Sequence, residues 1–480
     1  PKETKWRLAY RFGITIQDLE KNNPEIISGL KIGQEITVPK RSASEILKLE
    51  KEFNYYTVKP REGFYRLEKK LGVAKADLIS LNPRIVISGL QEGMILKIPL
   101  KLTGNLKIQN DLLVEKNNLR DSIPIDSKIT LGLLLPFKVN QIEFDSIEKT
   151  KSLLRKRNLH TLALDFYSGV FMAVEEATNL GIEVVLNVFD TQNDKEFLKN
   201  NLSQRSWSSN NFIIGPMVPS NFNFLALQDS LKLVPMIAPL SSNPVKDGKN
   251  IYQSVTSPKF LREKMFLYLD TVLDSTQNVL LISDSVNRGV EAQLYNRFPF
   301  AQILRPDPGG YVVPGLIDSL LVDTLMNKVV FESRNLGLIT SVISLLNSQI
   351  SKEREVQLFT TFRSNAYNNK NISIKHLGNL KFTYSAGEFS YDSDRSKTFD
   401  SLYVSSFGDL PKREAIRGYD VTLDAILRFS HQKRLSSDSL GETEYIESRF
   451  DYVPNSNTGF ENRAFYLLEH SDYEILEIKK

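Results

Sequence analysis

The sequence predicts an α/β protein in which two small strand–helix–helix–strand modules precede a larger, two-lobed region with parallel sheets. A stretch at Lys2–Leu30, "KETKWRLAYRFGITIQDLEKNNPEIISGL", recurs with changes at Arg61–Leu90. From Ile129 onward, short apolar runs alternate with helical patterns, which is typical of parallel sheets covered on both faces. The polar stretch 101–128 separates the two parts.

The two copies align at a nearly constant offset. An offset of 59 relates Gly13 to Gly72, and an offset of 60, after one inserted residue, relates Pro39 to Pro99. The length of 480 residues is too great for one core, so several domains are expected. The expected organisation is a first module at 1–40, which begins after its first strand, and a linker at 41–53. A second module at 54–100, a boundary segment at 101–128 and a large domain at 129–480 follow.

The spacing within the second copy predicts its elements. Apolar alternation and helical periodicity indicate a strand, two helices and a closing strand at Tyr55–Val58, Glu62–Leu71, Lys75–Leu81 and Met94–Pro99. Gly72 is expected to end the first helix in the left-handed conformation. The pair Asn82-Pro83 is expected to end the second helix because proline disfavours helical geometry in the residue before it.

The stretches "YTVKPREGFYRLEKKLGVAKADLISLNP" and "GLQEGMILKIP" resemble a LysM domain, a module that binds N-acetylglucosamine-containing glycans such as peptidoglycan. The resemblance covers the second copy and all but the first strand of the first copy. It implies a sugar groove between the loop after the first strand and the loop before the last strand. Carried over, the groove residues are Lys2, Glu3, Thr4, Pro24, Glu25, Ile26 and Ile27 in the first copy, and Arg61, Glu62, Gly63, Pro83, Arg84, Ile85 and Val86 in the second.

The glycan-binding reading has alternatives. Thr or Ser is common in the family where the second copy has Gly63, whereas the first copy keeps Thr4. One or both modules could instead serve as spacers or as protein-docking units. Two weak sites on one polymer would gain avidity, which favours a repeated glycan module.

The charge of the chain is unevenly distributed. The first 100 residues hold 18 Lys and Arg against 12 Asp and Glu, and the remainder hold 43 Lys and Arg against 45 Asp and Glu. This basic excess favours an anionic polymer or reflects a solvated surface, and no nucleic-acid motif accompanies it.

The region after residue 128 predicts an alternating α/β fold. The expected strands are Ile129–Leu135, Glu183–Phe189, Phe212–Ile214, Val234–Ala238, Asn278–Asp284, Lys328–Ser333 and Val356–Thr361, with helices at Leu164–Leu180 and Leu336–Leu346. About eight such units favour two lobes over one.

The order of "ITLGLLLPF", "FIIGPMVPSN", "VPMIAPLSSNP", "VLLISDSVNRGVE" and "AIRGYDVTLDAILRF" resembles a type 1 periplasmic binding protein, the family of leucine- and amino-acid-binding receptors. In that family, ligands lie between the lobes and contact loops at the carboxyl ends of strands. The resemblance implies a cleft formed by Pro136, Phe137, Ser220, Ser241, Ser242, Asn287, Arg288 and Gly289. It supplies no acidic partner for a ligand's ammonium group.

Two further features of the large domain are a long first loop and two segments rich in aromatic residues. Lys138–Leu162 is longer than a tight first loop, and we expect it over the cleft mouth as a lid, a partner-binding element or a disordered stretch. The aromatic residues of Leu380–Asp392 and Phe450–Ile478 are expected to belong to the core and to the last strands.

Catalytic motifs are absent from the sequence. It has no cysteine, which excludes disulfides and thiolate nucleophiles within these residues. Its four histidines lack metal-site or catalytic spacing, so no metal and no cofactor is expected. A carboxylate-based glycosidase is left open by composition, although the α/β resemblance argues against it. No apolar run reaches the roughly 18 to 20 residues that would cross a membrane.

These observations predict a non-enzymatic envelope protein. LysM repeats would bind peptidoglycan, and the receptor-like domain would dock or scaffold another envelope or outer-membrane protein complex, as the resemblance to receptor-like domains of outer-membrane lipoproteins implies. A periplasmic location is expected, with outer-membrane association through a segment upstream of Pro1. The alternatives are a wall-tethered receptor for an amino acid or another small ligand and a glycan-cleaving enzyme.

Overall fold

A computed structural model of the chain divides into two compact units, Pro1–Val114 and Glu115–Lys480. It describes residues 19, 21–26, 36–37, 53–58, 63–82, 85, 90, 95–99, 119–121, 123–124, 127–202, 207–243, 248–389, 393–436, 440–455 and 459–478. Residues 41–52 of the predicted linker 41–53 and most of the first copy lie outside the described residues, and residue 53 belongs to a strand.

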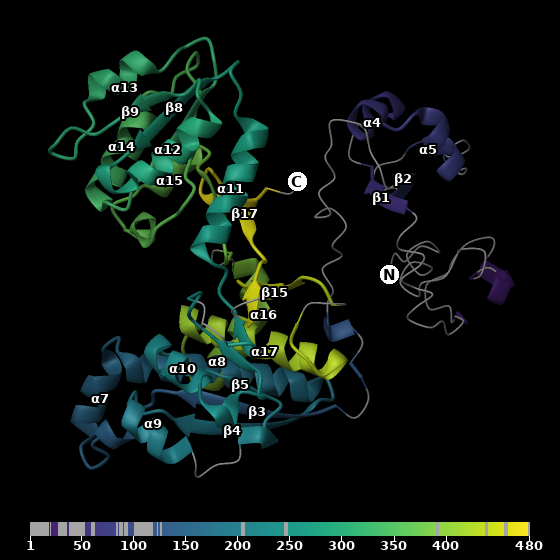
Figure 1. Cartoon of the computed structure of the whole chain (residues 1–480), viewed down its shortest axis with the longest axis vertical. Helices are drawn as coiled ribbons and strands as arrows, with labels where there is room; N and C mark the ends of the chain where they lie inside the picture. The colour runs from purple at the N-terminus through teal and green to yellow at the C-terminus, as the bar shows by residue number, and fades with distance from the viewer. Residues whose placement is uncertain are drawn as a thin grey trace. The chain divides into compact units, whose positions relative to one another are not determined.

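The second copy has the predicted strand–helix–helix–strand order. Its elements are β1 (Phe53–Thr57), α4 (Phe64–Leu71), α5 (Lys75–Leu81) and β2 (Ile95–Pro99) (Figure 1). The two strands pair antiparallel. Gly72 has φ of 62°, and its N–H donates to the carbonyl of Glu68 at 2.9 Å, which confirms the predicted left-handed helix end. The bounds differ by one or two residues: β1 begins at Phe53 and ends at Thr57, α4 begins after Gly63, and β2 begins at Ile95.

One side-chain hydrogen bond is common to both copies. Asn23 Nδ2 donates to the carbonyl of Leu19 at 2.8 Å, and Asn82 Nδ2 donates to that of Leu78 at 2.9 Å. Both leucines are fully buried. Asn23 also donates to the carbonyl of Thr37 at 2.7 Å. The offset of 59 read from the sequence therefore relates equivalent positions in the two folded modules.

The first lobe of the second unit is built on a seven-stranded sheet in the order β15-β16-β7-β6-β5-β3-β4. All neighbours pair parallel except β15 and β16. The strands are β3 (Lys128–Leu135), β4 (Glu183–Asp190), β5 (Phe212–Ile214), β6 (Met236–Ala238), β7 (Ile251–Gln253), β15 (Tyr452–Asn455) and β16 (Gly459–Asn462).

Two long helices, α8 (Leu159–Asn179) and α17 (Arg413–Gln432), lie side by side against this sheet (Figure 1). Glycines allow their close approach. A Cβ atom on Gly169 would lie 1.8 Å from the carbonyl oxygen of Ala415, and one on Gly418 would lie 2.3 Å from that of Phe166. A second core on the other side of the sheet includes residues of α9 (Lys195–Leu202) and α10 (Pro219–Ala226).

The second lobe repeats this arrangement with the sheet order β18-β17-β12-β11-β10-β8-β9. The strands are β8 (Asn278–Ser283), β9 (Gln302–Leu304), β10 (Asn327–Glu332), β11 (Val356–Phe359), β12 (Thr383–Ala386), β17 (Tyr466–Ser471) and β18 (Glu474–Glu477). One core contains residues of α11 (Pro258–Val272) and α12 (Arg288–Arg297), and another contains residues of α13 (Pro314–Leu320), α14 (Leu336–Ser348) and α15 (Ile374–Asn379).

The chain passes between the lobes three times. The crossovers connect β7 to α11, β12 to α16 (Ser393–Phe407), and β16 to β17. The two lobes and their mostly parallel sheets confirm the predicted α/β fold class. Sequence periodicity did not indicate the short strands β7 and β9. The predicted core role of the aromatic residues is confirmed for Tyr384, Tyr452 and Tyr466, each at most 2% exposed.

Two segments around the predicted domain boundary and first loop are now placed. Leu119, in η3 (Leu119–Asp121), is buried in the first-lobe core, so the end of the expected boundary segment packs in the second unit. The long first loop contains η4 (Val139–Gln141) and α7 (Ile147–Arg155). Of its three alternatives, simple disorder is therefore wrong. Among the described residues, no helix is long and apolar enough to cross a membrane.

Candidate functional site

The expected glycan groove of the second module is described at two positions. Gly63 is exposed at the N-terminal cap of α4, and a Cβ atom there would meet no neighbour within 4 Å. Ile85 is only 3% exposed and packs in the module core. The other groove residues proposed for this copy lie outside the described part of the chain: Arg61, Glu62, Pro83, Arg84 and Val86.

The first module shows the same division. Pro24 and Glu25 are exposed in η1 (Pro24–Ile26), whereas Ile26 is fully buried. The remaining positions lie outside the described residues: Lys2, Glu3, Thr4 and Ile27. Because the side chains of Ile26 and Ile85 are buried, these two positions can meet a sugar through their backbone groups only.

The proposed cleft residues of the first lobe have separate surroundings. Pro136 is buried after β3, and the ring of the half-buried Phe137 meets that of Tyr167 edge to face at 5.8 Å. Ser220 is exposed in α10. Ser241 and Ser242 are half-buried after β6, and Ser241 Oγ accepts from the N–H of Asn243 at 3.1 Å.

The proposed cleft residues of the second lobe lie at the start of α12. Asn287 donates to the carboxylate of Asp284 at 2.8 Å, and Arg288 donates to that of Glu291 at 2.8 Å. Gly289 is exposed. None of the eight proposed cleft residues lines the large cavity described next.

A cavity of about 680 Å³ opens within the second unit. Its wall comes from both lobes and from the first two crossovers, and includes apolar and aromatic side chains such as Phe362, Tyr384 and Phe389. This volume is in the range of small-molecule sites. Five charged residues also line it: Arg363, Glu388, Arg413, Arg417 and Glu447.

Arg417 is a structural anchor in this wall. Its side chain is 5% exposed, and it donates to the carbonyl of Pro239 at 3.1 Å. It also donates to Ser448 Oγ at 3.0 Å and to Ser254 Oγ at 2.8 Å. One buried guanidinium thus ties α17 to the loop after β6, to the first crossover and to the turn at Ser448.

Glu388 pairs with two arginines. Its carboxylate lies 2.6 Å from a guanidinium nitrogen of Arg413 and 3.7 Å from one of Arg417. Burial alone would raise the pKa of Glu388, but the charges of Arg417 and Arg413 hold it below its ordinary value. Glu388 is therefore ionised at neutral pH.

Asp420 and Glu447 are the other carboxyl groups near this wall. The Asp420 carboxylate accepts from the backbone N–H groups of Ile446, Glu447 and Ser448 at 3.1, 3.0 and 2.9 Å, and burial raises its pKa to about 6. Glu447 is 8% exposed. Burial, together with the charges of Glu388 and Asp420, raises the pKa of Glu447 to about 8. No residue in the described ranges donates a hydrogen bond to its carboxyl group.

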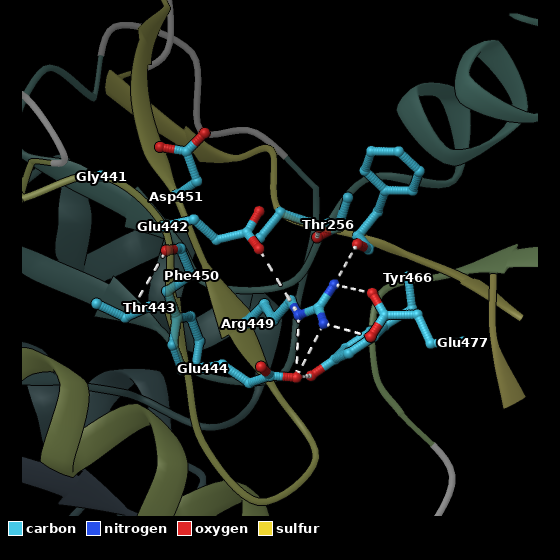
Figure 2. A network of polar contacts seen from close by, with 12 residues as sticks. Thr256, Gly441, Glu442, Thr443, Glu444, Arg449, Phe450, Asp451, Tyr466 and Glu477 are labelled. Carbon is cyan, nitrogen blue, oxygen red and sulfur yellow. Dashed lines mark hydrogen bonds and ion pairs between the residues drawn. The ribbon is translucent and has the colours of Figure 1, made fainter. Parts of the chain in front are cut away.

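A second polar network lies beside the third crossover (Figure 2). Arg449, in β14 (Arg449–Phe450), makes two hydrogen bonds to Glu477 of β18, at 2.6 and 2.7 Å. It also donates to Glu444 at 2.9 Å, lies 3.6 Å from Glu442, and stacks on the ring of Tyr466 at 3.8 Å. These bonds join the β14 strand to the last strand of the second-lobe sheet.

The sequence reasoning missed the charged residues of the cavity. The family resemblance directed attention to loops at strand ends, whereas Arg413 and Arg417 lie on a helix and Glu388 lies on a crossover. The four-residue spacing of the two arginines, which places them on one helix face, was the available signal.

Comparison with known proteins found one matching domain family and several similar solved structures. Residues 1–39 and 56–99 match the LysM domain family. The structure is similar to LpoA from Haemophilus influenzae, with 15% identity and a TM-score of 0.45 over 77% of this chain and 62% of LpoA, less than two thirds of its length.

Solved structures of substrate-binding proteins are also similar to this chain. A putative branched-chain amino acid transporter protein from Rhodospirillum rubrum shares 13% identity, with a TM-score of 0.48, over 73% of this chain and all of its own. LivJ from Streptococcus pneumoniae, in complex with isoleucine, shares 13% identity with a TM-score of 0.39 over the same fractions. No curated protein matches the chain.

The repeated module and the two-lobed sheets define the class: a protein with LysM domains and an additional two-lobed α/β unit. This particular chain carries two LysM domains, followed by a unit of two α/β lobes with mostly parallel sheets.

Proposed function

We propose that this protein is a non-enzymatic component of the cell envelope that binds peptidoglycan through its LysM repeats and docks another envelope protein through its second unit. The two LysM matches support the wall-binding half. The proposal includes a periplasmic location and an association with the outer membrane. Two linked modules would hold one glycan network by avidity.

The observation that carries the docking half is the segment around α7. No residue of this nine-residue helix is buried. Phe144 is 72% exposed and Ile147 is 68% exposed, while Val139 and Leu154 are also exposed. Isolated exposed apolar residues are common, but several in one segment are typical of a surface that a partner covers. The partner-binding alternative for this segment is therefore the one we favour.

Capture from envelope extracts tests the docking half. The full chain is compared with a Phe144→Ser/Ile147→Ser double variant and with Leu233→Ser, which alters a 95% exposed leucine elsewhere in the first lobe. We expect the same envelope protein to be captured by the full chain and by Leu233→Ser, and its yield to fall at least tenfold with the double variant. Equal capture by all three proteins would contradict docking through α7.

A second candidate function, binding of a small solute, is supported by the cavity between the lobes. The eight cleft residues proposed from the sequence do not line it, so an amino-acid site at those positions stays a separate proposal. Titration with leucine tests that proposal. If Ser241 and Ser242 hold the ligand, the full chain should bind leucine and the Ser241→Ala/Ser242→Ala variant should not.

A further inference from the structure

The charged residues of the cavity carry an excess of positive charge. Three arginines, Arg363, Arg413 and Arg417, face two glutamates, Glu388 and Glu447. The excess persists even with both glutamates ionised. A low-dielectric wall strengthens such a field, so the cavity favours an anion over a neutral or cationic solute.

The arginines differ in how much of their hydrogen-bonding capacity the protein uses. All three nitrogens of Arg417 donate to protein oxygens. Arg413 donates through one nitrogen to Glu388, and two-thirds of its side chain is exposed. Arg363 donates to Asn368 at 2.7 Å, and its buried Nε atom has no partner among the residues that the structure describes. Arg363 and Arg413 thus retain donors for a ligand.

These two arginines come from different lobes. Arg363 follows β11 of the second lobe, and its guanidinium lies 5.0 Å from the ring of Tyr384, which restricts its orientation. Arg413 opens α17, a 20-residue helix of the first lobe that has no side-chain cap. The partial positive charge of this helix end adds to that of Arg413.

Glu447 supplies the third, independent observation. More than nine-tenths of this residue is buried, it lines the cavity, and none of the described residues donates to its carboxyl group. A ligand in the cavity could supply the hydrogen-bond partner that the described residues do not. The carboxyl group of Glu447 is therefore available to a ligand.

We infer that the cavity binds a small organic anion with two carboxylate groups, one held by Arg363 and the other by Arg413 and the carboxyl group of Glu447. Guanidinium groups pair with carboxylates through two parallel hydrogen bonds, which suits this ligand class. The inference rests on the second candidate function and is independent of docking through α7.

The site also predicts how binding depends on pH. Glu388, Asp420, Arg413 and Arg417 are the charged groups that act on Glu447. Since the pKa of Glu447 is raised to about 8, its carboxyl is largely protonated at pH 7 and can donate to a carboxylate. Ionisation above pH 8 replaces that hydrogen bond with repulsion, so anion affinity is expected to fall there.

Calorimetric titration of the full chain at pH 7 tests the inference. The probes are succinate, glutarate and L-glutamate, with succinamide as the neutral counterpart of succinate. At least one dicarboxylate is expected to bind at least tenfold more tightly than succinamide.

Variants test which residues hold the anion. Arg363→Gln and Asn368→Asp, which places a carboxylate beside Arg363, should each weaken binding at least tenfold. Arg155→Gln, which removes an exposed arginine of α7, should leave binding unchanged. In Glu447→Gln, binding should persist at pH 9.

Three results would overturn the inference: no binding of any dicarboxylate, equal binding of succinamide, or equal weakening by Arg155→Gln. Leucine is titrated in parallel. If leucine binds and the dicarboxylates do not, the solute-binding function stands and the dicarboxylate site is wrong. If none of these probes binds, both are wrong.

Discussion

Buried charged residues in the second unit are of two kinds. Arg428 and Asp424 are both fully buried and pair at 2.9 Å, and Arg428 also donates to Thr443 Oγ at 2.8 Å and to the carbonyl of Phe450 at 2.7 Å. Such a satisfied pair fixes α17 against the β14 strand. By contrast, no residue in the described part of the chain donates a hydrogen bond to the carboxyl group of Glu447. For this reason we assign a ligand-binding role to Glu447 and a structural role to the Arg428–Asp424 pair.

Replacement of Glu447 should change how stability depends on pH. The folded-state pKa of about 8 lies above the usual value near 4.5. Between these values the unfolded chain releases the proton and the folded chain keeps it, so stability falls as pH rises. Glu447→Gln should remove this contribution and stabilise the protein at pH 8 by on the order of 2 to 4 kcal/mol.

Thermal unfolding at pH 5 and pH 8 measures this effect. Wild type should lose more stability over this interval than Glu447→Gln, while Glu175→Gln, at an exposed position of α8, should follow wild type. Parallel losses in all three proteins would show that Glu447 is ionised in the folded state.

Two glycines of the second LysM module should respond in opposite ways to serine. Gly63 has φ of −98° and open space around it, and α4 has no side-chain cap, so Gly63→Ser should stabilise the helix by a few tenths of a kcal/mol. Gly72→Ser places a side chain at φ of 62° and should cost about 1 kcal/mol. Hydrogen exchange of α4 amides reports both changes. A loss of protection in Gly63→Ser would contradict the capping argument.

At the scale of secondary-structure elements, the sequence predicted the bounds of those helices and strands that depend on neighbouring residues. The helix α5 has the predicted bounds because its apolar spacing and the following Asn-Pro pair both act locally. Strand β3 was likewise predicted within one residue from its apolar run. The cavity was not predicted, because Arg363, Arg413 and Glu447 are brought together only by the crossovers between the lobes.

The crossing of α8 and α17 depends on glycine at the contact. Gly169→Ala places a methyl group 1.8 Å from a carbonyl oxygen of Ala415, so the helices must separate. We expect a loss of about 3 kcal/mol, at the upper end of the cost of overpacking. Gly315→Ala, in α13, meets no neighbour within 4 Å and should be neutral or slightly stabilising. Equal unfolding midpoints in denaturant for the two variants would contradict this close packing.

At the scale of the whole molecule, the two units differ in the features that carry the proposed functions. The LysM unit repeats one small fold and holds the basic excess of the sequence. The second unit contains the cavity and the exposed apolar residues of α7. We therefore propose that the repeats attach the protein to peptidoglycan and that the larger unit recognises other molecules.

Sedimentation with purified peptidoglycan sacculi tests this central claim most directly. The full chain is compared with a fragment that starts at Glu115 and so retains Leu119 and its contacts in the second unit. We expect the full chain to sediment with the sacculi and the fragment to stay in solution. Sedimentation of both proteins, or of neither, would contradict wall binding through the LysM repeats.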